Sequence, residues 1–439
     1  MPTANTTSTE QVSNDPTGLA RIFRALRYRN YRLFFIGQGI SLIGTWMQQV
    51  AMSWLVYSLT NSPFMLGLVA FSGLICNFIL APFAGVLVDR LNRHRILIIT
   101  QSLAMCQALV LAAVVLTGHA AVWNLVVLSA TLGTINAFDM PTRQSFVVEM
   151  VDDRMDLGNA IALNSSLFNS ARLIGPTVAG VLVATIGEGL CFLLNGLSFI
   201  AVIACLLAMT ITPRAAPVGQ ADFLAGLKEG FRYSFGFLPI RYIVLLLTYT
   251  SLVAMPYPVL LPVFARDVLK GDASTLGFLT AGIGTGALVG AIFMASRKNI
   301  LGIGKIIIIA AFLFGAGLIL LSFTRVLWFT LLSMALTGFG MVSMMAACNT
   351  FLQTVADDDK RGRVMSFYVM AFMGLAPFGS LIYGALASTI GAPPTLLIGG
   401  MLCLAGAGVF AWKFTSEKGL VHAAYVKKGI VSDHERGQQ

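Results

Sequence analysis

Residues 85–95 read GVLVDRLNRHR and join two long apolar runs, Leu66–Ala84 and Ile96–Leu116. An aspartate, Asp89, closes the first run, and three arginines crowd the positions that follow it. Charges packed this densely between two segments long enough to cross a bilayer mark a short turn outside the membrane. Apolar runs of this kind recur along the chain, so the sequence predicts a membrane protein with many spans.

The composition favours the bilayer as the solvent of this chain. Of its 439 residues, 57% are hydrophobic and 11% are charged, whereas ordinary soluble domains carry about 25% charged residues. The net charge of +10 does not indicate nucleic-acid binding, because the basic residues are spread over short connections. The six cysteines lie within apolar runs without a CxxC pair, and no GxxxxGK[ST] signature occurs. We therefore predict no disulfide, no metal site, no cofactor and no enzymatic activity.

The apolar runs divide the chain into segments of membrane length. A helix needs about 20 apolar residues to cross about 30 Å of hydrocarbon. By this measure we predict an all-α membrane protein with twelve transmembrane helices, at residues 32–59, 65–88, 95–117, 121–142, 158–185, 189–211, 240–265, 275–296, 303–323, 327–350, 364–388 and 393–414.

The distribution of Lys and Arg predicts how these helices are oriented. All of them lie in the termini or in alternate connections on one side, apart from Arg172, Arg266, Lys270 and Arg325. Because cytoplasmic connections are enriched in Lys and Arg, both termini are predicted to be cytoplasmic. An error of one in the helix count would scramble this alternation, which supports the count of twelve.

The longest internal connection separates two blocks of six helices. We predict a disordered cytoplasmic N-terminus at 1–20, an N-terminal half at 21–212, a cytoplasmic linker at 213–238, a C-terminal half at 239–415 and a loosely ordered cytoplasmic tail at 416–439. Within the linker, Leu224, Leu227, Phe231 and Phe235 share one helical face, which predicts a short amphipathic helix. Aligning the halves places Gly175 on Gly379 and Gly180 on Gly384. Tandem six-helix repeats are typical of transporters with a site between the halves.

Several motifs give the chain a family resemblance. Gly85-x3-Asp89-Arg90-x2-Arg93-x-Arg95 resembles the loop 2–3 motif of the major facilitator superfamily, and Ala162-x8-Ala171-x3-Gly175-Pro176-x2-Ala179-Gly180 resembles its antiporter motif in helix 5. Segments 44–63, 141–144, 260–269 and 361–368 are similar to the transmembrane secretion effector branch. The resemblance covers residues 21–414 and implies the major facilitator fold, with secondary active efflux that exchanges a solute for protons by alternating access. The predicted helix 4, residues 121–142, contains no basic residue, so the arginine motif of the superfamily's drug–proton antiporters is not carried over.

The turn motif suggests a latch between the halves. It comprises Gly85, Asp89, Arg90 and Arg93, and its partner is the N-terminus of the eleventh helix beside Arg363. A carboxylate near a helix N-terminus gains roughly 0.3–2 kcal/mol. Such a contact would hold the cytoplasmic ends together in one state and release them in the other. The alternative is that Asp89 is a solvated turn charge.

The fifth predicted helix carries a face of small residues. Such faces allow helices to approach closely in lipid. We predict a seam on which the halves rock, formed by Ala171, Gly175, Pro176, Ala179 and Gly180. Its predicted partner is the eighth helix, through Gly282, Gly286 and Gly290. Tight packing without any rocking would use the same residues.

Arg172 is the one charge deep in a predicted span. It lies about 21 Å beyond Gly158, at a rise of about 1.5 Å per residue. Charges within a membrane are costly and mark functional sites by default. Two interpretations stay open: Arg172 faces substrate in a wet cavity, or it bonds to carbonyl groups freed by Pro176.

The resemblance also implies that helices 1, 4, 7 and 10 line a central cavity. Aromatic, amide and methionine side chains there would suit a bulky, partly aromatic organic molecule. The candidates are Gln38, Thr45, Trp46, Gln49, Asn136, Arg172, Tyr249, Tyr257, Met345 and Asn349. No Asp or Glu occupies the middle of a predicted span, so Asp139 is the candidate for proton coupling. Taken singly, each of these residues is more simply explained by helix packing.

We therefore predict a monomeric exporter in the cytoplasmic membrane of a bacterium. Its partners would be a small amphipathic organic substrate of the drug or siderophore class, protons and the lipid bilayer. Two alternatives stay open: a flippase for a lipid-like substrate, and a membrane scaffold or sensor that transports nothing. The tandem repeat argues against a scaffold, whereas the lack of an acid in mid-span leaves it open.

Overall fold

The structure is built from long helices. It is a computed structural model that describes residues 23–151, 153–211, 223–297 and 299–428, and every regular element in those ranges is a helix. The N-terminal segment 1–20, predicted to be disordered, lies outside the described residues. So do the first part of the predicted linker and the end of the predicted tail.

A first group of six long helices follows a short 3-10 helix, η1 (Arg24–Arg27). It comprises α2 (Arg29–Thr60), α3 (Pro63–Arg90), α4 (Arg93–Leu116), α5 (Val122–Phe146), α6 (Arg154–Ile186) and α7 (Glu188–Leu207), with the 3-10 turn η2 (Val147–Glu149) after α5. Two of these helices begin at side-chain caps: Asn92 accepts a hydrogen bond from the backbone N–H of Arg95, and Asp153 accepts one from that of Met155. Such caps satisfy N–H groups that have no partner within the helix.

A second group of long helices occupies the C-terminal half. It comprises α9 (Leu238–Val253), α11 (Ala273–Ala295), α12 (Ile303–Phe323), α13 (Leu327–Val355), α14 (Arg361–Gly374), α15 (Ala376–Ile390) and α16 (Ala392–Ser416). Between α9 and α11 the chain forms three short pieces, η3 (Tyr257–Leu260), α10 (Leu261–Val263) and the π-helix η4 (Phe264–Val268). Pro256, Pro258 and Pro262 explain this break, because proline lacks the backbone N–H that a continuous helix needs.

Two further helices lie beside the second group. Helix α8 (Phe223–Gly236) falls in the predicted linker, and its Glu229 pairs with Lys360 and Arg363 near the start of α14. Hydrogen bonds from Lys360 and Arg363 hold the pKa of Glu229 below its ordinary value. Helix α17 (Lys418–Lys427) corrects the prediction of a loosely ordered tail. It is anchored by Tyr425, which is buried beside the ring of Phe351.

Many of these helices are suited to a bilayer. Within the described part of the chain, ten helices or runs of consecutive helices are long and apolar enough to cross a membrane. Helices α2 and α5, of 32 and 25 residues, are not among these ten. Both carry the polar residues of the site described below. The chain is thus a multi-pass membrane protein.

The two groups use the same pattern of helix pairs. In the first group α3 packs on α5, α4 on α7, and α2 on both α6 and α7. In the second group α11 packs on α13, α12 on α16, and α9 on both α14 and α16. Gly187, between α6 and α7, and Gly391, between α15 and α16, have φ values of +82° and +87°, which favour glycine. The two groups thus share this pattern of helix pairs.

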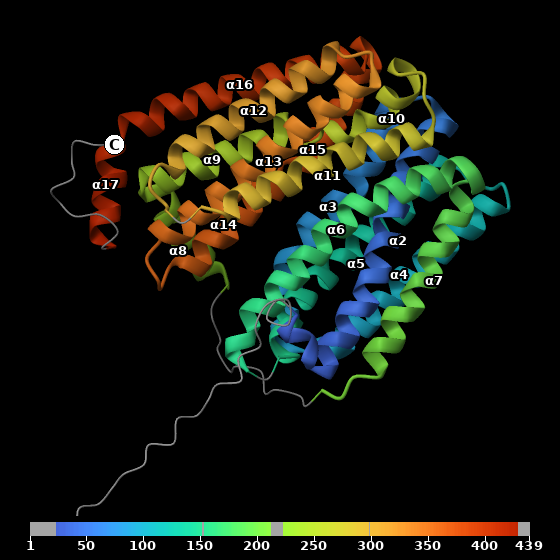
Figure 1. Ribbon diagram of the computed structural model, residues 1–439, viewed down its shortest axis with the longest axis horizontal. Helices are drawn as coiled ribbons and strands as arrows, with labels where there is room; N and C mark the ends of the chain where they lie inside the picture. The colour runs from blue at the N-terminus through green and yellow to red at the C-terminus, as the bar shows by residue number, and fades with distance from the viewer. Residues whose placement is uncertain (1–22, 152, 212–222, 298, 429–439) are drawn as a thin grey trace, which may run out of the picture.

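The groups meet where α6 packs on α11 and α3 packs on α15 (Figure 1). A Cβ atom on Gly180 would lie 2.8 Å from the carbonyl oxygen of Ala273 and 2.9 Å from the Cα of Gly277. A Cβ atom on Gly384 would lie 2.7 Å from the carbonyl oxygen of Pro63 and 3.0 Å from the Cα of Gly67. Gly180 and Gly384 are the residues that the sequence alignment of the halves superposes. We call these two contacts the glycine crossings.

The seam predicted on the fifth helix needs two corrections. Gly282, Gly286 and Gly290 face α13, because Cβ atoms there would meet Met334, Ala335 and Ser343. Gly175 faces α2 within its own group, where a Cβ atom would lie 2.5 Å from that of Trp46. The prediction correctly paired α6 with α11, which is the eighth predicted helix, but it chose the face of α11 that meets α13. The residues of α11 that meet α6 are Ala273, Ser274, Gly277 and Gly284.

Candidate functional site

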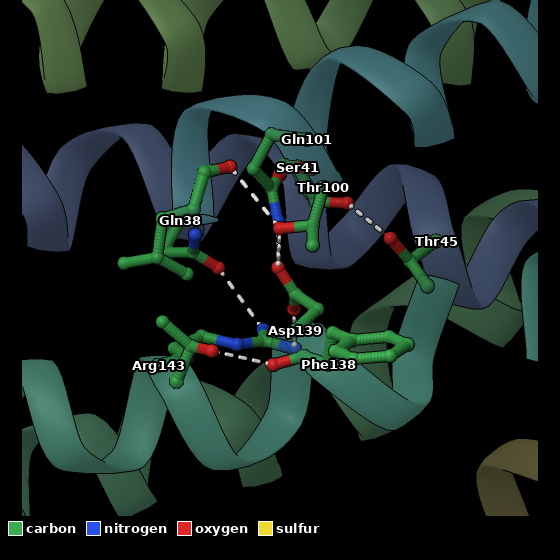
Figure 2. Close-up of polar contacts among 10 residues, drawn as sticks. Gln38, Ser41, Thr45, Thr100, Gln101, Phe138, Asp139 and Arg143 are labelled. Carbon is green, nitrogen blue, oxygen red and sulfur yellow. Dashed lines mark hydrogen bonds and ion pairs between the residues drawn. The ribbon is translucent and has the colours of Figure 1, made fainter. Parts of the chain in front are cut away.

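A buried polar network joins three helices of the first group around Asp139 (Figure 2). Its carboxylate accepts hydrogen bonds from Thr100 Oγ1 at 2.9 Å and Gln101 Nε2 at 2.7 Å, both on α4. The guanidinium of Arg143, one turn further along α5, donates to Asp139 at 2.7 Å and to Gln38 Oε1 on α2 at 3.1 Å. Asp139 and Gln38 are 3% and 2% exposed. The network thus balances a buried carboxylate with a charge and two neutral donors.

Arg143 corrects an expectation from the sequence. The fourth predicted helix was expected to end at residue 142 and to contain no basic residue. Helix α5 continues to Phe146 despite Pro141, and Arg143 is therefore part of it. A spacing of four residues places Asp139 and Arg143 on the same face of the helix. That spacing was visible in the sequence and would have identified the pair.

Arg172 lies midway along α6 and faces an aromatic ring. Its guanidinium carbon is 6.0 Å from the ring centroid of Trp46, a distance typical of a cation–π contact. Among the described residues Arg172 has no hydrogen bond and no carboxylate partner. The ring of Trp46 in turn meets that of Phe168 edge-on, with centroids 5.9 Å apart.

Tyr257 lies on the second helix group, in the broken segment after α9. It is 1% exposed, and its hydroxyl has no hydrogen-bond partner among the described residues. Its ring packs edge-on against Phe314 at 6.1 Å. The charge of Arg172 acts on this phenol, so the two groups lie near one another across the boundary between the helix groups.

The other cavity candidates are dispersed. Thr45 and Gln49 are exposed on α2, and Asn136 is half-buried on α5. Tyr249 donates a hydrogen bond to the carbonyl of Leu402, which directs its hydroxyl toward α16. Met345 and Asn349 are half-buried on α13, and Asn349 accepts a hydrogen bond from Gln353.

In the described part of the chain, Gly85 and the start of α14, which the predicted latch would bring together, do not make contact. A Cβ atom on Gly85 would have no described atom within 4 Å, and the same holds for Gly362 at the start of α14. Arg93 donates to Glu149 at 2.8 Å, and Arg363 pairs with Glu229. Arg90 is exposed, and the side chain of Asp89 lies outside the described part of the chain.

A polar contact that the sequence did not reveal joins the two groups beside the glycine crossings. The hydroxyl of Tyr57, near the end of α2, hydrogen-bonds to the carboxylate of Asp267 in η4. The guanidinium carbon of Arg266 is 5.9 Å from the ring centroid of Tyr57. The only signal in the sequence was a charged pair, Arg266 and Asp267, next to a predicted span.

Comparisons with known proteins agree with this fold. The staphyloferrin A transporter of Staphylococcus aureus is 26% identical over 375 residues, which cover 84% of this chain and 92% of that protein. The multidrug efflux pump Tap of Mycolicibacterium fortuitum is 26% identical over 370 residues, covering 82% and 88%. The solved structure of a D-xylose–proton symporter superposes with a TM-score of 0.70 at 16% identity, covering 88% of this chain and 98% of that chain.

A family model described as transmembrane secretion effector matches residues 20–419, nearly the whole chain. The fold is also that of solved transporters of the major facilitator superfamily. The chain belongs to the transmembrane secretion effector family, a branch of the major facilitator superfamily of membrane transporters.

Proposed function

We propose that this protein exports an amphipathic organic molecule of the drug or siderophore class by alternating access, in exchange for protons. The observation that carries the proposal is the pair of glycine crossings, which join two helix groups with the same internal packing. Two such bodies can rock about their shared contact and expose a central site to either side in turn. The family, together with the siderophore and drug transport for which its relatives are named, supports the cargo class.

The proposed architecture is twelve membrane spans in two six-helix repeats. Helices α2 and α5 would be the two spans that complete the ten most apolar ones. The segment from α9 to η4 would count as one span, and α14 with α15 as another. With these spans we propose the domain boundaries predicted from the sequence: an N-terminal half at 21–212, a linker at 213–238 and a C-terminal half at 239–415.

The proposed orientation places both termini in the cytoplasm of a bacterium. Lys270 and Glu188 would then be external, and the contact between Tyr57 and Asp267 would lie at the external end. The described structure would be the inward-facing state, with Gly85 and Gly362 at the parted cytoplasmic ends. Labelling of single cysteines in whole cells with an impermeant reagent tests this: position 270 should react and position 228 should not.

In the outward-facing state we propose that the cytoplasmic ends close. The turn of Gly85, Asp89, Arg90 and Arg93 would then approach the start of α14, where Gly362 leaves room for a close contact. Arg363 would exchange its present partner, Glu229, for the turn. Of the predicted seam residues, Pro176 and Gly180 meet Gly277 of α11, and they would serve as the bearing surface in the described state.

We propose that Asp139 carries the proton. While the three helices stay together, its carboxylate pairs with Arg143 and accepts hydrogen bonds from Thr100 and Gln101. A movement of α2 or α4 would remove Gln38 or the donors Thr100 and Gln101, and the carboxylate could then take a proton. The remaining cavity candidates would contact the cargo. Because one chain contains both halves, we propose that the protein acts as a monomer in the bilayer.

Transport in inside-out membrane vesicles tests the proposed function. Vesicles that contain the protein should accumulate an amphipathic drug or siderophore when an acidic interior is imposed, and nigericin should abolish the uptake. The matched control is a Gly180→Leu variant, which cannot close the glycine crossing and should not accumulate the solute. Uptake that ignores the proton gradient would contradict antiport. A lipid-like substrate that changes leaflet without entering the lumen would indicate a flippase, and no movement of any solute would indicate a scaffold.

A further inference from the structure

We infer that Arg172, Trp46 and Tyr257 form a binding site for an organic anion with an aromatic body, at the boundary between the two helix groups. The site takes the charged group of the ligand at Arg172 and its aromatic part at Trp46. Its role in the cell rests on the proposed transport function, whereas binding itself can be measured on the purified protein.

The first step is the unsatisfied charge of Arg172. A charge at this depth is stable only beside a partner or water. The described partner is the face of Trp46, at 6.0 Å, and a ring face accepts none of the five N–H groups of a guanidinium as a conventional hydrogen bond. No described carboxylate or carbonyl accepts them either. These donors are therefore available to an anionic ligand.

The second step is the buried hydroxyl of Tyr257. A hydroxyl that is buried without a partner costs free energy, because it has lost its hydrogen bonds to water. Among the described residues the buried hydroxyl of Tyr257 has no hydrogen-bond partner. The charge of Arg172 acts on the phenol of Tyr257. A ligand that offers oxygen acceptors to Arg172 and to Tyr257 would satisfy both groups. This requirement selects a carboxylate or a phenolate and disfavours a cation.

The third step is the aromatic surface beside the charge. Trp46 and Phe168 meet edge-on at 5.9 Å, and Phe168 is 40% exposed. An aromatic ligand can stack on such a surface in an offset or edge-on geometry. The anion is thus expected to carry a ring close to its charged group.

The position of the site links it to the movement of the halves. The carbonyl of Arg172 faces Gly284 of α11, where a Cβ atom would lie 3.3 Å away. Along α6, Arg172 is about 12 Å from the crossing at Gly180, at about 1.5 Å per residue. A ligand held there would contact α2 and α6 of the first group and Tyr257 of the second. Separation of the two groups at this level would break the site.

Binding to the purified protein in lipid nanodiscs tests the inference. The probes are pyrenebutanoate and pyrenebutylammonium, which share an aromatic body and differ in charge, and empty nanodiscs correct for partition into lipid. The variants are Arg172→Gln, Arg172→Lys and Tyr257→Phe. The matched control is Arg325→Gln, because Arg325 donates to the carbonyls of Ser322 and Thr324 at the end of α12, away from the site.

The wild type should bind the anionic probe at least tenfold more tightly than the cationic one. Arg172→Gln should weaken the anion about 10- to 100-fold and leave the cation unchanged, in line with the loss of a hydrogen bond to a charged group. Arg172→Lys should weaken it less, because the charge remains without the planar fork. Tyr257→Phe should weaken the anion about threefold to tenfold, and the control should stay within twofold.

Equal affinities for the two probes in the wild type would overturn the inference, as would equal losses for both probes in Arg172→Gln. If the Arg172 variants do not fold, Tyr257→Phe decides, since an unchanged affinity for the anion refutes the site. Selective binding of the anion without any gradient-driven transport would refute the proposed function and leave the site standing. Proton-driven transport without preference for the anionic probe would support the proposed function and refute the anion-binding site.

Discussion

A single methyl group at a glycine crossing should change which state of the protein is populated. In Gly180→Ala the new Cβ would lie 2.8 Å from the carbonyl oxygen of Ala273 and 2.9 Å from the Cα of Gly277. Carbon atoms in favourable contact are about 3.5–4.0 Å apart, so α6 and α11 must separate by roughly 1 Å. Both contacts are with backbone, which cannot turn aside as a side chain could.

The cost falls on only one of the two states. Overpacking of this size typically costs about 1–3 kcal/mol. Alanine also gains about 1 kcal/mol over glycine within a helix, but that gain applies to both states and cancels from their equilibrium. The remaining difference shifts the equilibrium about 5- to 150-fold toward the state in which the crossing is open. An open state populated at about 1% would rise to between about 5% and 60%.

Distances between spin labels measure this shift. Labels at Leu59 and Lys270, on opposite groups beside the crossing, should move apart in Gly180→Ala, whereas labels at Leu91 and Asp359, at the other end, should approach. Gly158→Ala is the matched control, because a Cβ there would meet no described atom within 4 Å. Gly384→Ala should act like Gly180→Ala, since its Cβ would press on Pro63 and Gly67. Unchanged distances in both Gly180→Ala and Gly180→Leu would refute the reasoning.

Four further perturbations have definite expected outcomes. Gly85→Leu should leave the stability of the described state unchanged, because a Cβ there meets no described atom within 4 Å. The variant should nevertheless transport more slowly, because the larger side chain blocks closure of the cytoplasmic ends. Transport at the wild-type rate would mean that the latch does not form. Asp139→Asn should keep substrate binding and remove its dependence on a pH gradient, and persistence of that dependence in vesicles would exclude Asp139 as the coupling group. Tyr57→Phe removes the hydrogen bond to the Asp267 carboxylate, worth about 1.5–3 kcal/mol, so the labels at Leu59 and Lys270 should populate the longer distance about 12- to 160-fold more. Unchanged distances in both Tyr57→Phe and Asp267→Ala would contradict a shared contact. Glu229→Gln should speed hydrogen exchange in α8 and at the start of α14, and the wild type should show the same change only in acid. The lowered pKa of Glu229 keeps the contact intact above the ordinary glutamate value, and the contact is lost as the pH falls further. Equal exchange rates in variant and wild type at neutral pH would show that the ion pairs do not hold α8.

The sequence alone determined the class of the molecule, because transfer of apolar residues from water to lipid depends on composition and length and hardly on neighbours. The runs on either side of residues 85–95 are helices α3 and α4, and the turn between them lies where the charges required it. The alignment that placed Gly180 on Gly384 also anticipated two positions that make the same kind of contact in the structure. These features are local or repeat along the chain, and a pattern of residues is enough to reveal them.

Helix boundaries were less well determined near polar residues. Arg143 was assigned to a cytoplasmic connection because such connections are rich in Lys and Arg, yet α5 carries it into the fold through its bonds to Asp139 and Gln38. A partner 105 residues away in the chain decided this, together with a carboxylate one turn away. The tail after residue 415 likewise looked polar throughout, and the burial of Tyr425 against Phe351 made part of it helical.

Tertiary structure alone decided which faces meet. A helical period shows that Gly282, Gly286 and Gly290 share a face, but it does not show that this face meets α13 while Gly277 and Gly284 meet α6. Nor does it show that Tyr57 and Asp267, separated by 210 residues, come together between the helix groups. Each helix in a bundle has several neighbours, and the choice among them depends on the shapes of all the helices packed at once, which no single stretch of sequence contains.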